Sequence, residues 1–311
     1  MPYREIPHQL AIVNRKCTVD LYIRIREEYR VFAARGAMLP EEQLQRYAKV
    51  RLYALVPDDV DPREHQDALL MDILTDEEVS PQVKADIAYQ VSMQSIREVF
   101  EVTNHRTLSA LEKVSKQVVR LILADSRVVD KFIGLSSVDH YTFVHQVKVG
   151  LYGTAMAINL FGDSMSDHDL DRLSMGFFLH DIGMTKVPAT ILNKEEPLLD
   201  SEWDTIRKHP LWGQERLRKA AYESDEANDI VLYHHERCDG NGYPFGKTRG
   251  EIPLYARICA IADTFESLTA HRPFKSARSP FDALKIMQAE MANEFDPDLF
   301  RAFIMLLGPR G

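Results

Sequence analysis

The stretch HHERCDGNGYPFG, His234 to Gly246, joins two adjacent histidines to a segment rich in glycine and proline. The apolar letters IVLY precede it at residues 230–233, and the apolar run IPLYARICAIADTFESLTA follows at residues 252–270. Gly and Pro interrupt regular structure, whereas a long apolar run of this kind is typical of a buried helix. We therefore expect a loop over residues 239–253, with the histidine pair before it and a helix after it.

A helical pattern extends on both sides of this stretch, from about Ser80 onward. Apolar residues recur at three- and four-residue spacing, which predicts amphipathic helices. The clearest segments are SPQVKADIAYQVSMQSIREVFE, RTLSALEKVSKQVVRLILA and YTFVHQVKVGLYGTAMAINLF. The predicted fold class is therefore mainly α, with a helical domain over residues 101–311.

Residues 1–100 follow a different pattern, which predicts a small α/β domain. TVDLYIRI at 18–25 alternates polar and apolar residues and YRVFA follows at 29–33, so a β-hairpin is expected. EEQLQRYAKV at 41–50 predicts a short helix, RLYALV at 51–56 a further strand, and PDDVDPREH at 57–65 a linker. The role expected for this domain is regulation or dimerisation, and a homodimer is one expected assembly.

Composition narrows the classes of partner and compartment. The net charge of -9 argues against a nucleic-acid partner. The three cysteines show no paired spacing, which favours a reducing compartment over a disulfide framework. The N-terminal residues lack a signal pattern, and the apolar stretches are too short to cross a bilayer. We expect a cytoplasmic protein without a membrane partner.

Several histidines and two aspartates have the character of metal ligands. A single buried histidine is more often a hydrogen-bonded core residue than a ligand. Two adjacent imidazoles repel each other when charged, however, and an aspartate within an apolar run is costly to bury without a partner. A bound cation satisfies all of them at once. The candidates are His145, His180, Asp181, His209, His234, His235 and Asp263.

The nature of these ligands limits the choice of metal. Nitrogen and oxygen donors alone exclude a cysteine-type structural zinc site. Imidazole with carboxylate suits iron, manganese or zinc, and nickel also fits. Seven ligands are too many for one ion but suit two ions bridged by a carboxylate, with positions left open for water. The expected cofactors are two divalent ions per chain, iron or manganese in the first place.

These motifs resemble the HD-GYP family, a branch of the HD superfamily of metal-dependent phosphohydrolases. The resemblance rests on LHDIG at 179–183, VPATILNK at 187–194, EWDTIRKHPLWG at 202–213, HHERCDGNGYPFG, the apolar run that contains Asp263, and Lys275. It covers the chain from about His105 to the C-terminus. It implies an all-helical domain that cleaves cyclic di-GMP to pGpG or GMP by means of a bridging water that the two ions activate.

The resemblance also assigns roles to individual residues. The seven candidates above would be the metal ligands, with Asp181 bridging the two ions. Asp181, Arg272 and Lys275 would be catalytic, because an arginine fork and a lysine suit a phosphate. The substrate would contact Arg272, Lys275 and the loop residues Gly242, Tyr243 and Pro244. Gly240 and Gly242 permit a tight loop path, and this loop could also contact a signalling protein.

Two departures from the family pattern shape the expectations. Met184 stands where the family usually has a lysine, and Lys186 is expected on another side of the segment. This motivates an alternative function, a cyclic di-GMP receptor or interaction module with weak or no turnover. Tyr141 stands where some members have a glutamate for a third metal, so two metals are expected. A third interpretation, hydrolysis of another phosphoester, is disfavoured by the GYP loop.

Overall fold

The computed structural model describes residues 3–6, 17, 20–25, 28–38, 51–55, 73–74, 77, 79–134, 141–162, 168–194, 196–270 and 277–308. Contacts along the chain divide it into two compact units, Met1–Gln90 and Val91–Gly311. The division falls within a single helix, ten residues before the domain boundary predicted after residue 100. The regulatory or dimerisation role of the first unit stays a prediction.

The first unit contains an antiparallel four-stranded sheet in the order β1-β4-β2-β3. β2 (Leu21–Ile25) and β3 (Glu28–Ala33) form the predicted hairpin, and β4 (Leu52–Leu55) is the predicted further strand. β1 (Tyr3–Ile6), which the sequence pattern did not reveal, pairs with β4. The helix predicted over 41–50 and the linker predicted over 57–65 lie outside the described residues.

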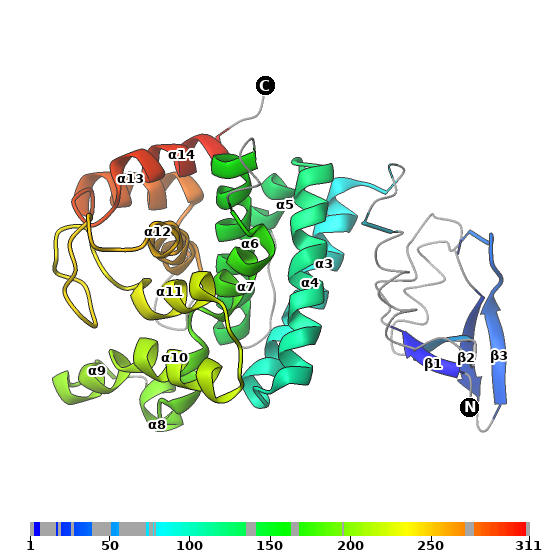
Figure 1. Cartoon of the computed structure of the whole chain (residues 1–311). Coiled ribbons are helices and arrows are strands. Elements are labelled where there is room, and N and C mark those ends of the chain that lie inside the picture. The colour runs from blue at the N-terminus through cyan, green and yellow to red at the C-terminus, as the bar shows by residue number, and fades with distance from the viewer. Residues whose placement is uncertain are drawn as a thin grey trace. The chain divides into compact units, whose positions relative to one another are not determined.

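The second unit is helical, as predicted, and Figure 1 shows its helices gathered around α6 and α12. Short polar caps start several of them, including Asn104 before α4 and Ser224 before α11, whose side chains accept backbone N–H groups. The elements are α3 (Pro81–Glu101), α4 (His105–Ala124), α5 (Val128–Gly134), α6 (Tyr141–Phe161), α7 (Leu170–Leu179), η3 (Ile182–Lys186), α8 (Ala189–Leu192), α9 (Asp200–Ile206), α10 (His209–Lys219), α11 (Asp225–Tyr233), α12 (Leu254–Thr269), α13 (Pro280–Glu290) and α14 (Pro297–Leu307).

Helices α6, α7, α11 and α12 form the core that carries the site. Gly150 and Gly153 of α6 lie against the rings of Phe178 and Phe177 of α7, so closely that a Cβ on either glycine would overlap a ring. The absence of those side chains lets the two helices approach. Phe265 of α12 completes this core and is fully buried. The helices are thereby held in fixed positions, as close packing of a protein interior requires.

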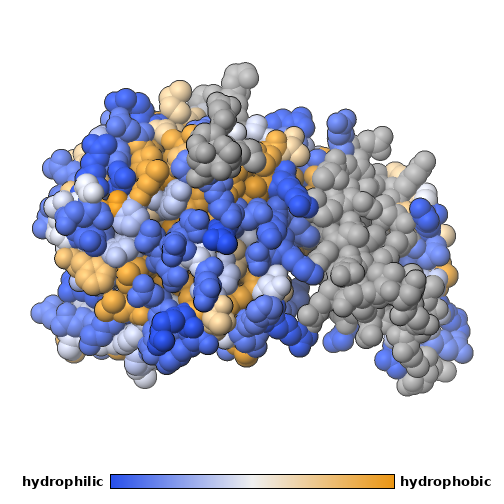
Figure 2. Space-filling view, viewed as in Figure 1, coloured by the Kyte–Doolittle hydropathy of each residue, from blue (hydrophilic) through white to orange (hydrophobic). Residues whose placement is uncertain are grey.

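The face of the molecule seen in Figure 2 carries mostly hydrophilic residues, with smaller hydrophobic areas among them. None of the helices in the described part of the chain has both the length and the apolar composition needed to cross a bilayer.

Candidate metal centre

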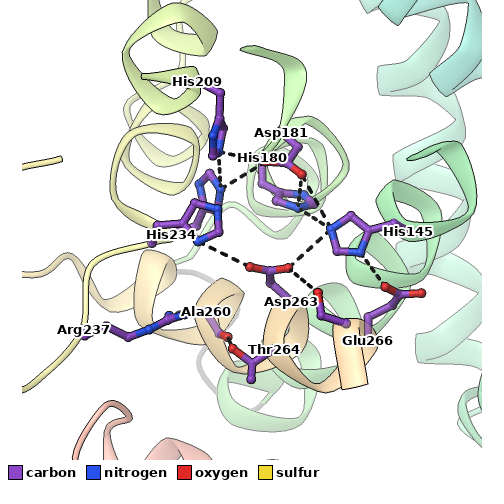
Figure 3. A network of polar contacts seen from close by, with 12 residues as sticks. His145, His180, Asp181, His209, His234, Arg237, Ala260, Asp263, Thr264 and Glu266 are labelled. Atoms are coloured by element: carbon purple, nitrogen blue, oxygen red, sulfur yellow. Dashed lines mark hydrogen bonds and ion pairs between the residues drawn. The ribbon is translucent and has the colours of Figure 1, made fainter. Parts of the chain in front are cut away.

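The seven predicted ligands come together from five parts of the second unit. His145 lies on α6, His180 caps the end of α7, and Asp181 follows it directly. His209 begins α10, the pair His234–His235 follows the last residue of α11, and Asp263 lies in the middle of α12. Figure 3 shows six of these side chains pointing toward one another, namely His145, His180, Asp181, His209, His234 and Asp263. Five of the seven are at most 6 % exposed as residues, and the side chains of Asp181 and His235 are 14 % and 19 % exposed.

The ligand atoms form two groups. The first contains Asp181, His209, His234 and His235, and the second contains His145, His180 and Asp263. Within each group one ligand atom per residue lies within 4.8 Å of all the others. The arrangement therefore offers two neighbouring positions for cations rather than one.

Asp181 faces both groups. Its Oδ1 lies 2.9 Å from Nε2 of His209 and 3.4 Å from Nε2 of His234. Its Oδ2 lies 3.6 Å from Nε2 of His145 and 3.6 Å from Nε2 of His180. Because its two oxygens face different groups, this carboxylate has the geometry needed to bridge two ions, as the family resemblance implies.

The imidazole rings are oriented by their Nδ1 atoms. Nδ1 of His180 lies 3.0 Å from the carbonyl oxygen of Phe177, and Nδ1 of His209 lies 2.8 Å from that of Ile206. Nδ1 of His234 lies 3.0 Å from the carbonyl oxygen of Val231. A carbonyl oxygen only accepts, so each ring carries its proton on Nδ1. Each Nε2 is then left with a lone pair directed into the cluster.

Those lone pairs meet at short range. Nε2 of His209 lies 3.2 Å from Nε2 of His234. Two unprotonated nitrogens repel each other at such a distance, and Oδ1 of Asp181 adds a further acceptor. A cation between these atoms removes the conflict. The donor set therefore fits divalent metal ions of the imidazole and carboxylate type.

The electrostatics keep most of these groups in the state that a metal ligand needs. Burial lowers the pKa of His180 to about 4 and also lowers the pKa values of His234 and His235. Burial acts to raise the pKa of Asp181, but His180 and His209 hold that pKa well below its usual range. At neutral pH these imidazoles are neutral and the carboxylate is ionised.

His145 has a different partner. Its Nδ1 lies 2.5 Å from Oε2 of Glu266, a carboxylate on α12. Burial acts to lower the pKa of His145, but the charge and hydrogen bond of Glu266, with Asp263 and Asp181, raise it to about 9. A cation that binds His145 must therefore displace a proton from it at neutral pH.

Close backbone packing brings the His-Asp turn to α10. A Cβ on Gly183 of η3 would overlap the carbonyl oxygen of His209 and would lie 2.6 Å from the backbone nitrogen of Gly213. A glycine at this position therefore lets the turn approach α10. The resulting contact places Asp181 beside His209.

The GYP loop folds back on the histidine pair, and residues 239–253 form the predicted loop. The ring of Tyr243 stacks on the ring of His235 with centroids 4.6 Å apart, and its backbone N–H donates to the carbonyl oxygen of His235. A Cβ on Gly242 would overlap the backbone of Glu236 and Arg237, which confirms the tight path expected there. Gly240 has a φ of +81°, the left-handed region that favours glycine.

Three of the residues that shape the site escaped prediction from the sequence. Glu266 contacts His145, and Nε2 of Gln146 donates to Oδ2 of Asp181 at 3.1 Å. The buried carboxylate of Glu236 accepts the backbone N–H groups of Phe245 and Lys247, and so fixes the GYP loop. One signal was present: Glu266 follows Asp263 by three residues, which places both on one face of a helix.

The other residues singled out in the sequence have separate positions. Met184 is half-buried in η3, directly after the His-Asp turn. Lys186 is exposed and forms an ion pair with Glu215 of α10, as expected for a residue on another side of the segment. Pro244 follows a cis peptide bond after Tyr243. Arg272 and Lys275 lie outside the described residues, so their roles stay predictions.

Residues 155–299 match the HD domain family. Among curated proteins, the chain is 38 % identical to cyclic di-GMP phosphodiesterase PA4108 of Pseudomonas aeruginosa, over 57 % of this chain and 42 % of the relative. It is 35 % identical to 3'3'-cGAMP-specific phosphodiesterase 3 of Vibrio cholerae, over 52 % of this chain and 34 % of the relative. The chain spans less than half the length of these relatives.

A solved structure agrees on the fold. The HDG"Y"P protein Bd1817 of Bdellovibrio bacteriovorus matches with a TM-score of 0.67 over 98 % of this chain and 99 % of that one, at 19 % identity. Residues 155–299 therefore carry an HD domain. The HD-GYP resemblance read from the motifs is thus confirmed, as is the mainly helical fold with a small N-terminal sheet. His145 precedes the residues matched to the HD domain family, yet it lies in one group with His180 and Asp263.

Proposed function

We propose that the chain is a metal-dependent phosphodiesterase that hydrolyses cyclic di-GMP to pGpG, GMP or both. The observation that carries the proposal is the pair of neighbouring ligand groups, with one carboxylate, Asp181, facing both. The name of the Pseudomonas aeruginosa relative supports cyclic di-GMP as the substrate. The name of the Vibrio cholerae relative makes 3'3'-cGAMP the second substrate to test.

Two divalent ions, iron or manganese, would be held by the seven ligands. Such ions, when bound, polarise phosphate oxygens and lower the pKa of water. The ligand set contains only two carboxylates, Asp181 and Asp263, which offset two of the four positive charges of such a pair. The surplus positive charge would attract an anionic phosphodiester locally, despite the net charge of -9.

The chain's own residues would position the substrate around this centre. We assign phosphate contacts to Arg272 and Lys275 on the family resemblance. Tyr243 packs over His235 and would present the GYP loop, with Gly242 and Pro244, at the edge of the site. Burial, together with the charges of Asp181 and Asp263, raises the pKa of the Tyr243 hydroxyl. This hydroxyl therefore stays protonated at neutral pH and can donate a hydrogen bond.

The alternative is a cyclic di-GMP receptor with weak or no turnover. Met184 supports it, because a thioether cannot donate a proton or carry a charge where the family usually has a lysine. Lys186 is engaged with Glu215 and offers no replacement. The two functions differ in one measurable respect: a receptor binds the dinucleotide and leaves it intact.

We further propose that residues 1–100 regulate the site through α3, which begins in the first unit and ends in the second. Arg216 of α10 donates to Oγ1 of Thr103 at 2.6 Å and to the carbonyl oxygen of Phe100 at 3.1 Å. Phe100 also packs edge-on against Phe143, with centroids 5.9 Å apart. Both partners of α3 belong to helices that carry ligands, namely His209 on α10 and His145 on α6.

The test is turnover and metal content measured on one preparation. Anaerobically purified protein is analysed for iron and manganese, then incubated with cyclic di-GMP and, separately, with 3'3'-cGAMP. We expect two ions per chain and release of pGpG or GMP. Asp181→Asn removes the shared ligand charge and should abolish both, whereas Glu215→Gln, an exposed change of the same kind, should not.

Undiminished turnover in the Asp181 variant would rule out the proposed centre. Two ions with intact cyclic dinucleotides would favour the receptor. Cytoplasmic location, a homodimer and a protein partner at the GYP loop stay predictions from the sequence.

A further inference from the structure

Glu266 is a fully buried carboxylate that neither the sequence motifs nor the proposed function uses. It lies on α12, its residue is 0 % exposed, and its Oε2 lies 2.5 Å from Nδ1 of His145. An ionised side chain at such a depth is costly unless it is paired. The contact of 2.5 Å pairs the Glu266 carboxylate with His145, which is a candidate metal ligand.

The contact sets His145 apart from three other rings of the cluster. His180, His209 and His234 direct Nδ1 at neutral backbone carbonyl oxygens. Of these four rings, only that of His145 directs its Nδ1 at a carboxylate. A carboxylate partner fixes the same tautomer as a carbonyl does but draws more strongly on the Nδ1 proton, which makes Nε2 a stronger donor toward a cation.

Helix α12 holds the His145 ring from both ends. Asp263 and Glu266 are three residues apart and lie on one face of the helix. Oδ1 of Asp263 is 3.3 Å from Nε2, while Glu266 contacts Nδ1. Figure 3 shows Glu266 on the side of the ring opposite Asp181. One turn of α12 therefore supplies both a ligand of the second group and the support of its neighbour.

A competing role for Glu266 is to balance Lys148, which lies one turn beyond His145 on α6. Burial lowers the pKa of Lys148, and the charge of Glu266 offsets only part of that shift. No short contact joins Lys148 and Glu266 among the described hydrogen bonds and ion pairs, whereas the contact with His145 is 2.5 Å. Geometry thus favours the imidazole as the group on which Glu266 acts, and Lys148 becomes the control.

We infer that Glu266 is a positioning residue that holds Nδ1 of His145 and strengthens the cation position formed by His145, His180 and Asp263. The inference rests on the proposed metal centre. It makes the two positions unequal. In the other group, which contains Asp181, the rings of His209 and His234 direct Nδ1 at carbonyl oxygens. Nδ1 of His235 lies 3.7 Å from Asp263, too far for a hydrogen bond, so this group should not depend on Glu266.

The first experiment titrates Mn²⁺ into metal-free protein by calorimetry. We expect two binding events in the wild type. In Glu266→Gln, which keeps the size and an acceptor oxygen but removes the charge, one event should weaken about 10- to 100-fold and the other should stay unchanged. Lys148→Gln should leave both events as in the wild type.

The outcomes separate the two proposals. Two unchanged events in Glu266→Gln, equal weakening of both, or the same loss in Lys148→Gln would overturn this inference alone. A wild-type chain that binds no Mn²⁺ would overturn the proposed centre instead. Glu266→Asp keeps the charge but withdraws the carboxylate by about 1.5 Å, so it should weaken the same single event, and less than Gln does.

A second measurement needs no variant and so is independent of folding defects. In Zn²⁺-loaded wild-type protein with ¹⁵N-labelled histidine, the Nδ1 proton of His145 should resonate downfield of the corresponding protons of His180, His209 and His234. The reason is that a proton shared with a carboxylate at short range is less shielded than one donated to a carbonyl. Equal positions of all four resonances would overturn the inference.

Discussion

Replacement of Gly183 by alanine should damage the metal centre without removing any ligand. The added Cβ would lie 2.6 Å from the backbone nitrogen of Gly213 and would overlap the carbonyl oxygen of His209 still more. An ordinary contact needs about 3.5 Å, so η3 and α10 must separate by about 0.9 Å or more. The contact of 2.9 Å between His209 and Asp181 spans this interface and would open.

The magnitude follows from that displacement. Overpacking of this kind typically costs about 1–3 kcal/mol of stability, which a domain of this size can tolerate. A misplacement of about 1 Å in a catalytic constellation can cost about 100-fold in rate. We therefore expect Gly183→Ala to fold, to bind Mn²⁺ more weakly in one of two events, and to lose about 100-fold in turnover of cyclic di-GMP.

The assay combines Mn²⁺ titration, turnover and circular dichroism on the same sample. Gly162→Ala is the matched control, because a Cβ at Gly162 would meet nothing within 4 Å. It should behave as the wild type in all three measurements. A Gly183→Ala protein with wild-type Mn²⁺ affinity and turnover would refute the argument that this close approach positions His209.

Three further predictions follow from the site. Met184→Lys should raise turnover, by up to about 100-fold if the missing lysine assists the leaving group, and an unchanged steady-state rate would count against that role. Arg216→Ala should lower the melting temperature of the protein by a few degrees, because it removes hydrogen bonds worth about 1–3 kcal/mol. It should also weaken any effect of residues 1–100 on turnover. Replacement of the exposed Arg218 on the same helix by alanine should change neither the melting temperature nor that effect. Metal-free protein should be most stable near pH 6.5. The pKa of His180 falls from 6.5 to about 4 on folding, so about 3 kcal/mol of the free energy of unfolding is lost as the pH drops from 6.5 to 4. The pKa of His145 rises to about 9 on folding, so a similar part of the free energy of unfolding is lost as the pH rises from 6.5 to 9. Urea unfolding across this range tests it, and a stability that changes in one direction only would contradict the opposed shifts.

The sequence by itself determined the fold class and the seven candidate ligands that the structure brings together. Helical periodicity is a local property, and so are the caps and the glycine-rich breaks that end helices, which is why the second unit could be predicted. The ligands could be named because paired histidines such as His234 and His235, and an aspartate within an apolar run such as Asp263, are chemically costly without a cation. The hairpin of β2 and β3 followed from alternation over a short span.

Only the tertiary structure decided how these residues divide and what supports them. That Asp181 presents one oxygen to each group depends on α6, α7, α10 and α11 meeting at one turn, which no local pattern encodes. In the sequence, Glu266 is only a further polar residue of α12, and its role becomes visible because the folded chain places His145 of α6 beside it. β1 was missed for the same reason, since its partner β4 lies almost fifty residues away. Contacts between distant segments depend on packing, and packing is a property of the whole folded chain.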